Sequence, residues 1–190
     1  MKNLFVILIF TLLIASCGDA EVSFLQERAG LMYTPNSKVP FTGIYIEHWE
    51  GGTDKHKTEY QDGKEVGNIT GWYSSGQISY ALTFKYVDGQ KIRHTERWYE
   101  NGQMRELVET DDFGNYHGLM SEWYSNGQKM YEDNYSKGLR FGKGTRWFDN
   151  GQVELTANFV NGKLDGLLQK WDANGVILIY GIYKNGVPVE

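Results

Sequence analysis

One motif recurs along this chain, and its spacing restricts the fold more than any other feature. Tryptophan marks each copy, at intervals of 23, 26, 25, 24 and 24 residues. The six tryptophans are Trp49, Trp72, Trp98, Trp123, Trp147 and Trp171. Self-similarity at a period of roughly 20–50 residues is typical of repeat proteins, in which each unit packs against its neighbours in the chain.

The text around each tryptophan is also repeated. After five of them the chain aligns without gaps, as WYSSGQISYALTF, WYENGQMRELVET, WYSNGQKMYEDNY, WFDNGQVELTANF and WDANGVILIYGIY. The first copy, WEGGTDKHKTEY, is one residue shorter. A second turn signal follows the copies, for example QDGK at 61–64 and VNGK at 160–163. Each unit is therefore predicted to consist of two halves, each a strand and a turn.

The chemistry of these halves predicts β-hairpins. Asn-Gly and Asp-Gly accept positive φ at both central positions of a type I′ turn, which suits the twist of paired strands. Between the turns apolar residues alternate with polar ones, as in Val153, Leu155, Ala157 and Phe159. Alternation with a period of two indicates half-buried strands. We therefore expect an all-β protein of hairpins stacked side by side, with the six tryptophans as the repeat core.

The start of the chain reads as an export signal. A short basic stretch is followed by an apolar run over 4–14, too short for a transmembrane helix, which needs roughly 20 residues. The next residues, IASC at 14–17, resemble the lipobox of bacterial lipoproteins. The resemblance implies that 1–16 is a signal-peptide helix that is cleaved and that Cys17 is acylated. Cys17 is the one cysteine of the chain, so an intramolecular disulfide is excluded.

Composition narrows the class of partner. The net charge is −5, and the 19 Lys and Arg residues are scattered without a basic stripe. Nucleic-acid binding needs clustered positive charge, so nucleic acid is excluded as a partner. Aromatic residues make up 15% of the chain, with 23 glycines and 3 prolines. That balance favours many short strands and turns.

The sequence contains no recognisable catalytic or metal-binding motif. His48, His56, His94 and His117 lack metal-ligand spacing. The acidic clusters lie on or near predicted loops, where a solvated surface is the simpler interpretation. We therefore expect no enzyme activity, no cofactor, no metal and no catalytic residue.

Aromatic residues that follow the tryptophans form a second stripe, predicted to face the other side of the sheet. Its members are Tyr73, Tyr99, Tyr124 and Phe148. One interpretation is cross-strand packing that stiffens the sheet, and the other is a binding face for a protein, a glycan or a lipid. The last predicted strand, 176–183, is apolar on both faces. It is either buried under a cap or, if exposed, able to pair with another chain.

The repeated unit resembles the bacterial MORN-variant repeat family. The resemblance rests on an aromatic pair before Asn-Gly and a later aromatic residue before a second glycine turn, as in WYSNGQKMYEDNYSKG at 123–138. It covers about residues 41–187. It implies an elongated, twisted antiparallel meander of successive hairpins, a MORN-type repeat solenoid. Residues 17–40 are then the anchor linker and opening hairpin, and 41–190 a repeat domain of about six copies.

Together these features favour a non-catalytic lipoprotein, exported and anchored in a bacterial envelope at the outer membrane, whose repeat array acts as a protein-interaction scaffold. Its partners would be the membrane, through acylated Cys17, and a protein. Two other hypotheses stay open: a glycan- or lipid-binding module, and an antitoxin-like neutraliser of a partner toxin, which the family resemblance implies.

Overall fold

The computed structural model describes residues 22, 24–87 and 89–189. The predicted signal-peptide helix over 1–16 and the predicted acylation site Cys17 lie outside the described residues.

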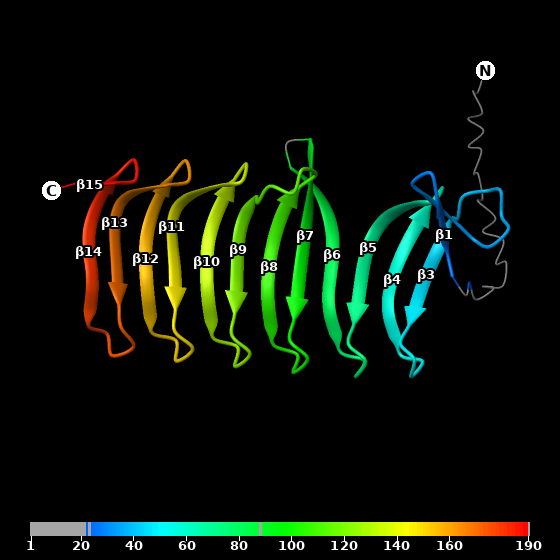
Figure 1. Ribbon diagram of the computed structural model, residues 1–190, viewed down its shortest axis with the longest axis horizontal. Coiled ribbons are helices and arrows are strands. Elements are labelled where there is room, and N and C mark those ends of the chain that lie inside the picture. Colours follow the sequence, from blue (N-terminus) through cyan, green and yellow to red (C-terminus); the bar gives the residue numbers. More distant parts are fainter. Residues whose placement is uncertain (1–21, 23, 88, 190) are drawn as a thin grey trace, which may run out of the picture.

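The described chain consists of β-strands joined by short turns. A small hairpin, β1 (Gln26–Arg28) and β2 (Leu31–Tyr33), comes first. The 13 strands that follow form one antiparallel sheet in which each strand pairs with the next in the chain (Figure 1). They are β3 (Gly43–His48), β4 (Asp54–Gln61), β5 (Lys64–Trp72), β6 (Ile78–Val87), β7 (Gln90–Trp98), β8 (Met104–Asp111), β9 (Gly118–Trp123), β10 (Lys129–Ser136), β11 (Leu139–Trp147), β12 (Val153–Val160), β13 (Lys163–Trp171), β14 (Ile177–Lys184) and β15 (Val187–Val189). The predicted all-β meander of hairpins is confirmed.

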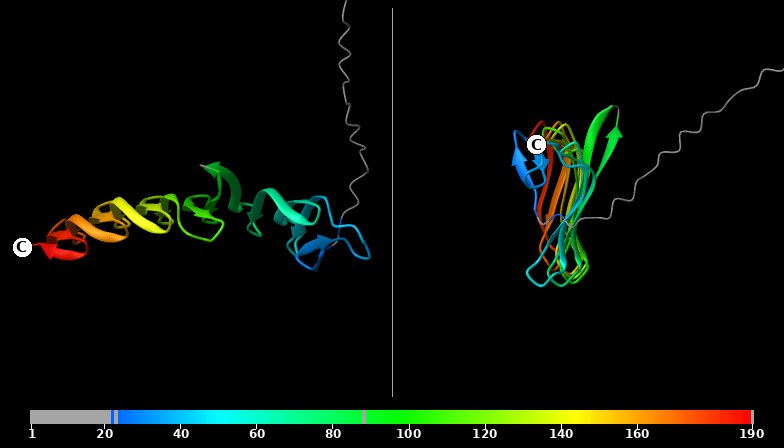
Figure 2. Two further views of the ribbon diagram at one scale, coloured as in Figure 1. Left: turned by 90° about the horizontal axis from the view of Figure 1, so that it is seen from above. Right: turned by 90° about the vertical axis from the view of Figure 1, so that its right-hand side faces the viewer.

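The sheet is long, open and twisted. Figure 2 shows the hairpins following one another along a single direction, with the first and last strands of the sheet at opposite ends. Strands contact the strand before and the strand after them in the chain. As in other repeat proteins, the stability of one unit therefore depends on its neighbours.

The two-residue second turns have the predicted type I′ geometry, whereas a longer loop joins β8, which ends at Asp111, to β9, which begins at Gly118. Asp62 and Gly63 have φ angles of 50° and 78°, and Asn161 and Gly162 have 49° and 78°. A two-residue loop of this type needs positive φ at both positions, which glycine, asparagine and aspartate tolerate. These turns form the upper side of the sheet in Figure 1.

The first turn of each unit, next to the tryptophan, differs from the predicted type I′ turn. The N–H of Gly76 donates to the carbonyl of Tyr73 at 2.9 Å, and the N–H of Tyr73 donates to the carbonyl of Gln77 at 2.8 Å. Three residues thus connect the strands, and φ is positive at Gly76 (85°) and not at Ser75. A three-residue loop closes as a type I turn followed by a left-handed glycine. Both turns of a unit carry the same kind of dipeptide, a polar residue followed by glycine. The different geometry of the two turns therefore comes from the length of the loop, three residues against two.

The buried centre of the sheet is one row of residues that crosses every strand from β4 to β14 on a single face, here called the central row. Cross-strand partners share a face, and the pairing register places them abreast, continued by one residue beyond the paired residues at Val108–Met120 and Asp133–Gly144. The row consists of Thr58, Ile69, Leu82, Thr95, Val108, Met120, Asp133, Gly144, Ala157, Leu168 and Gly181. Most of these residues are buried, including Thr58 (0% exposed) and Ala157 (1%).

The six tryptophans, predicted as the repeat core, lie at or just beyond the strand ends and border the buried centre. Trp49 is exposed, and the other five are half-buried. In five repeats a register shift falls immediately before the tryptophan, as between Arg97 and Trp98, and in the first repeat it falls one residue earlier, between Glu47 and His48. The extra residue lies on the following strand, as Arg105 does opposite Arg97 and Trp98, and such a bulge bends that strand beside the tryptophan.

Hydrogen bonds also join the turns of neighbouring units on both sides of the sheet. On the lower side in Figure 1, Nδ2 of Asn101 donates to the carbonyl of Ser125, 24 residues later, at 2.7 Å. The same bond recurs one copy further on. On the upper side, the N–H of Gly162 donates to the carbonyl of Arg140 at 2.9 Å. The turns therefore continue the stacking that the strands begin.

Gly144 offers a test of the central row. A Cβ at this position would overlap Oδ1 of Asp133 and lie 3.2 Å from Cε2 of Phe159. We expect Gly144→Ala to lower the free energy of unfolding by about 1–3 kcal/mol, as for other overpacked sites, measured by chemical denaturation. Gly51→Ala is the control, since a Cβ there would meet nothing within 4 Å. Equal stability of the two variants would contradict the close packing of this row.

Candidate functional site

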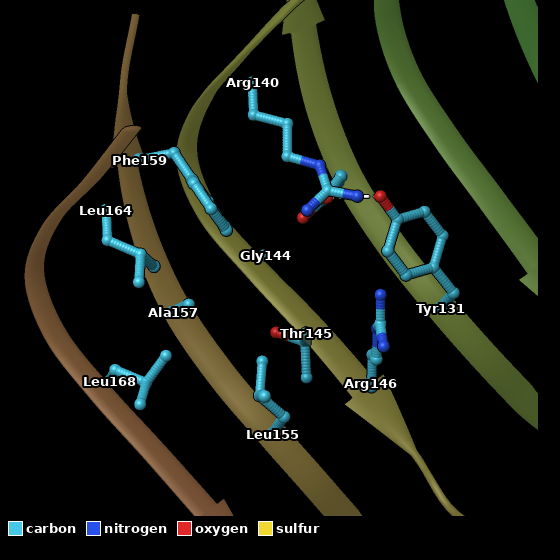
Figure 3. Close-up of a pocket in the computed structure, with 11 residues that line it drawn as sticks. Tyr131, Arg140, Gly144, Thr145, Arg146, Leu155, Ala157, Phe159, Leu164 and Leu168 are labelled. Carbon is cyan, nitrogen blue, oxygen red and sulfur yellow. Dashed lines mark hydrogen bonds and ion pairs between the residues drawn. The ribbon is translucent and has the colours of Figure 1, made fainter. Parts of the chain in front are cut away.

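A groove lies on the central-row face over β9–β13. It consists of two adjoining hollows of about 250 and 500 Å³, which share Tyr131, Arg140 and Arg146. Figure 3 shows the smaller hollow, in which Arg140 and Tyr131 point toward each other and apolar side chains from neighbouring strands face them. The larger hollow continues to Tyr124 and Trp147. Aromatic walls with a few polar groups are typical of a ligand site.

The groove is organised around a buried carboxylate. Asp133 is 2% exposed, and its Oδ2 pairs with Nε of Arg140 at 2.8 Å. The hydroxyl of Tyr131 donates to the same carboxylate, and the hydroxyls of Tyr131 and Tyr135 lie 2.9 Å apart. Burial, and then the bond to Asp133, raises the pKa of Tyr131, so its hydroxyl remains a donor. A buried charge persists when it is paired and hydrogen-bonded, and Asp133 is both.

Arg140 fills the centre of this network. Its guanidinium carbon lies 5.8 Å from the ring centre of Tyr131, 5.9 Å from that of Tyr135 and 5.3 Å from that of Phe159. Cations are attracted to the faces of aromatic rings at such distances. Gly144 lies on β11, as Arg140 does, and its missing side chain leaves the space that Asp133 of β10 occupies. The local sequence thus holds Arg140 and Tyr131 in fixed positions.

Three side chains from three adjacent strands line up beside this network. Tyr131 of β10 pairs with Glu122 of β9 on one side and with Arg146 of β11 on the other. The guanidinium carbon of Arg146 lies 5.6 Å from the centre of the Tyr131 ring. Burial, and then the charge of Glu106 on the next strand, raises the pKa of Glu122. A carboxylate, an aromatic ring and a guanidinium therefore stand abreast on one face.

Outside the groove, titratable groups are tied into local networks. Oε1 of Glu109 accepts a hydrogen bond from Nζ of Lys85 at 2.6 Å and lies 3.0 Å from Nδ1 of His94. Burial by itself would raise the pKa of Glu109, but the bonds from Lys85 and His94 outweigh it and hold the pKa below its usual value. Among the described residues, no three His, Cys, Asp or Glu side chains lie close enough together to hold a metal ion.

The predicted aromatic stripe is engaged in joining repeats. The hydroxyls of Tyr73, Tyr99 and Tyr124 donate to the backbone carbonyls of the tryptophans one unit later, at 2.7, 2.8 and 2.9 Å. Phe148 occupies the equivalent place without a hydroxyl. Of the stripe residues, Tyr124 lines the groove. Burial, followed by the charges of Asp149 and Glu154, raises its pKa.

The sequence analysis missed the residues that organise the groove. A signal was present: the pattern places Asp133 at the inward position that Val108 and Ala157 occupy in neighbouring copies. A charged residue at an otherwise apolar inward position indicates a paired, buried group. The partners Arg140 and Arg146 come from the next strand, where no local pattern identifies them.

The last long strand has an exposed, open edge. In the described part of the chain, β15 pairs with β14 over Ile182–Lys184, which leaves Ile177–Gly181 without a strand on that side. Its large apolar side chains are exposed on both faces, between 44% and 65%: Ile177, Leu178, Ile179, Tyr180 and Ile182. Of the two sequence-based interpretations of this strand, the exposed one is the arrangement observed.

Comparison with known proteins supports the repeat assignment. The family described as "MORN repeat variant" matches residues 116–137 and 164–185. No curated protein matches this chain. One similar solved structure is a protein of unknown function from Bacteroides fragilis NCTC 9343, which is 10% identical, with a TM-score of 0.18. The match covers 75% of this chain and 93% of that one. So low a TM-score leaves the function of this chain open.

The described residues contain no helix that is both long enough and apolar enough to cross a bilayer.

The hydrogen bonds from the stripe tyrosines to the tryptophan carbonyls predict different effects of two matched substitutions. Tyr99→Phe removes the bond to the Trp123 carbonyl and should lower the free energy of unfolding by about 0.5–1.5 kcal/mol. Phe148→Tyr adds a hydroxyl at the equivalent place, within reach of the Trp171 carbonyl, and should leave stability unchanged or raise it. Thermal unfolding followed by circular dichroism measures both. A Tyr99→Phe protein as stable as the parent would contradict a structural role for the stripe.

The raised pKa of Glu122 and the lowered pKa of Glu109 predict opposite effects of pH on the stability of two variants. The raised folded pKa of Glu122 means that its favourable contribution is present below the unfolded pKa, about 4.3, and is lost as pH rises through the folded value. Glu122→Gln should therefore stabilise the protein at pH 7, and the gain should shrink toward pH 4.

Glu109→Gln is the control of opposite sign. Because the folded pKa of Glu109 is lowered, its contribution is present above the unfolded pKa and is lost as pH falls through the folded value. This variant should be less stable at pH 7. Urea denaturation between pH 4 and pH 8 measures both profiles, and changes of the same sign would contradict the assigned environments.

Proposed function

We propose that this protein is a non-catalytic envelope lipoprotein, anchored in the outer membrane through acylated Cys17, whose repeat sheet acts as a scaffold for a protein partner. The export signal and the lipobox-like IASC at 14–17 support the anchor. The open sheet of repeats supports the scaffold, since extended repeat surfaces commonly serve binding. A toxin is one form that the protein partner could take.

The observation that carries the proposal is the edge of β14. Soluble proteins protect edge strands with charged side chains, prolines or short lengths, because an exposed edge pairs with other chains. Residues Ile177–Gly181 carry no charge, and their apolar side chains are exposed on both faces. An extended segment of a partner could add to this edge by main-chain hydrogen bonds while its side chains cover the apolar ones.

At the opposite end of the sheet, the edge strand β3 is protected against pairing with other chains by charged side chains. β3 carries Glu47, which pairs with Lys55 at 2.6 Å, and His48, which lies 3.0 Å from Asp54. Charges of this kind hinder edge-to-edge pairing. The contrast between the two ends directs the proposal to β14 in particular.

Cross-linking in cells tests this function. The full-length chain is expressed with its leader, envelope proteins are cross-linked, and proteins bound to the chain are identified by mass spectrometry. Leu178→Lys places a charge on the β14 edge, where Leu178 is 58% exposed, and should abolish recovery of the partner. Val39→Lys is the matched control, because Val39 is 71% exposed and lies far along the chain from β14.

Two results would contradict the proposal. One is the absence of any specific cross-linked protein, and the other is a partner that both lysine variants retain equally. The anchor is checked in the same cells: Cys17→Ser should move the protein from the membrane fraction to the soluble fraction. If the protein sediments with membranes irrespective of Cys17, the acylated anchor is excluded.

A further inference from the structure

We infer that the groove over β9–β13 is a binding site for an uncharged oligosaccharide, with Tyr131 as the stacking surface, Arg146 as the hydrogen-bond donor and Glu122 as the acceptor. This site is separate from the β14 edge and does not depend on a protein partner binding there.

The first observation is that Glu122 and Arg146 have unused hydrogen-bonding groups. Within the described chain, the carboxylate of Glu122 forms no hydrogen bond or ion pair, and at longer range the charges of Glu106, Arg105 and Arg146 act on it. The guanidinium of Arg146 lies against the Tyr131 ring and likewise forms no hydrogen bond or ion pair with a described residue. Both groups line the larger hollow. Guanidinium N–H groups donate and carboxylate oxygens accept, so the pair offers both kinds of hydrogen bond to a ligand.

The second observation is that the other charged groups around the groove are already paired. Arg140 pairs with Asp133 at 2.8 Å, and Lys170 pairs with Glu154 at 3.6 Å. In the same row of the sheet, two strands away, Arg97 pairs with Glu106. Glu122 and Arg146 therefore differ from their equivalents in neighbouring repeats, and the difference falls at the groove.

The third observation is that the ring between them is held rigidly. The hydroxyl of Tyr131 is fixed by Asp133, and Asp133 is fixed by Arg140 in a space that Gly144 leaves open. The equivalent inward positions of neighbouring repeats are apolar or threonine. A buried ion pair does not by itself stabilise a fold, so its presence here is best explained by the ring that it orients. A pre-organised surface loses less entropy when a ligand binds.

These groups select the class of ligand. One positive and one negative side chain flank Tyr131, from strands whose backbones are about 10 Å apart across two strand spacings. For an anion the attraction of Arg146 is offset by repulsion from Glu122, and for a cation the reverse holds, so the pair favours neither charge. A neutral sugar chain presents hydroxyls that both donate and accept, and it has apolar C–H faces that can lie on Tyr131 and Trp147. The open form of the groove allows a chain to pass along it, across the strands.

Isothermal titration with the purified mature chain tests this inference. The ligands are neutral tetrasaccharides of glucose with α-1,4 or β-1,4 linkages and the tetrasaccharide of N-acetylglucosamine, alongside a uronic-acid oligomer and an uncharged tetrapeptide. We expect at least one neutral sugar to bind, and Arg146→Ala and Glu122→Gln each to weaken that binding by about tenfold or more, as loss of a charged hydrogen-bonding partner does.

Arg93→Ala is the matched control, since Arg93 is an exposed arginine on the same face outside the groove. It should bind the sugar as the parent does, as should Leu178→Lys, which separates this site from the β14 edge. Circular dichroism establishes that each variant is folded. Failure of every neutral sugar to bind, binding unaffected by Arg146→Ala and Glu122→Gln, or preferential binding of the uronic acid or the peptide would each overturn the inference.

Discussion

Main-chain hydrogen bonding between successive units is the interaction on which the rest of this structure depends. The described chain forms a 13-stranded open sheet and the small β1–β2 hairpin, and within the described residues no helix or second large sheet covers the open sheet. Burial is limited to the central row and a few residues beside it. Ordering each residue costs about 1–2 kcal/mol, and one 24-residue unit buries too little apolar surface to offset that. A unit is therefore stable because its two neighbours complete its backbone hydrogen bonds and pack beside its part of the central row.

The side-chain hydrogen bonds that join the turns of neighbouring units follow from the same constraint. A single-layer sheet can twist or splay where its strands end, because nothing packs on its faces there. The tyrosine hydroxyls that reach the next tryptophan carbonyl and the asparagine side chains that reach the next turn tie these ends together. The aromatic stripe, considered from the sequence as either packing or binding, has its hydroxyls engaged in this role, which directs the search for a ligand site to the groove.

The groove departs from the regular pattern of the repeats. Along the central row the side chains are apolar, threonine or glycine except at Asp133. One charge in such a row requires a partner, room and hydrogen bonds, and Arg140, Gly144 and Tyr131 supply them. Local violations of a regular pattern, compensated by neighbours, are expected at functional sites. The exposed edge of β14 is a second departure, at the end of the array.

The sequence by itself determined the repeat period, the strands and the two-residue type I′ turns, because these depend on side-chain alternation and on residues that accept positive φ. It also predicts an export signal and acylation at Cys17, which lie outside the described residues. Only the tertiary structure decided that the tryptophans border the buried centre, since the register shift before each of them is set by pairing with the following strand. It likewise decided that Glu122, Tyr131 and Arg146 stand abreast. They belong to three strands, and which residues meet across strands depends on bulges and loop lengths accumulated over several turns, which no local stretch of sequence encodes.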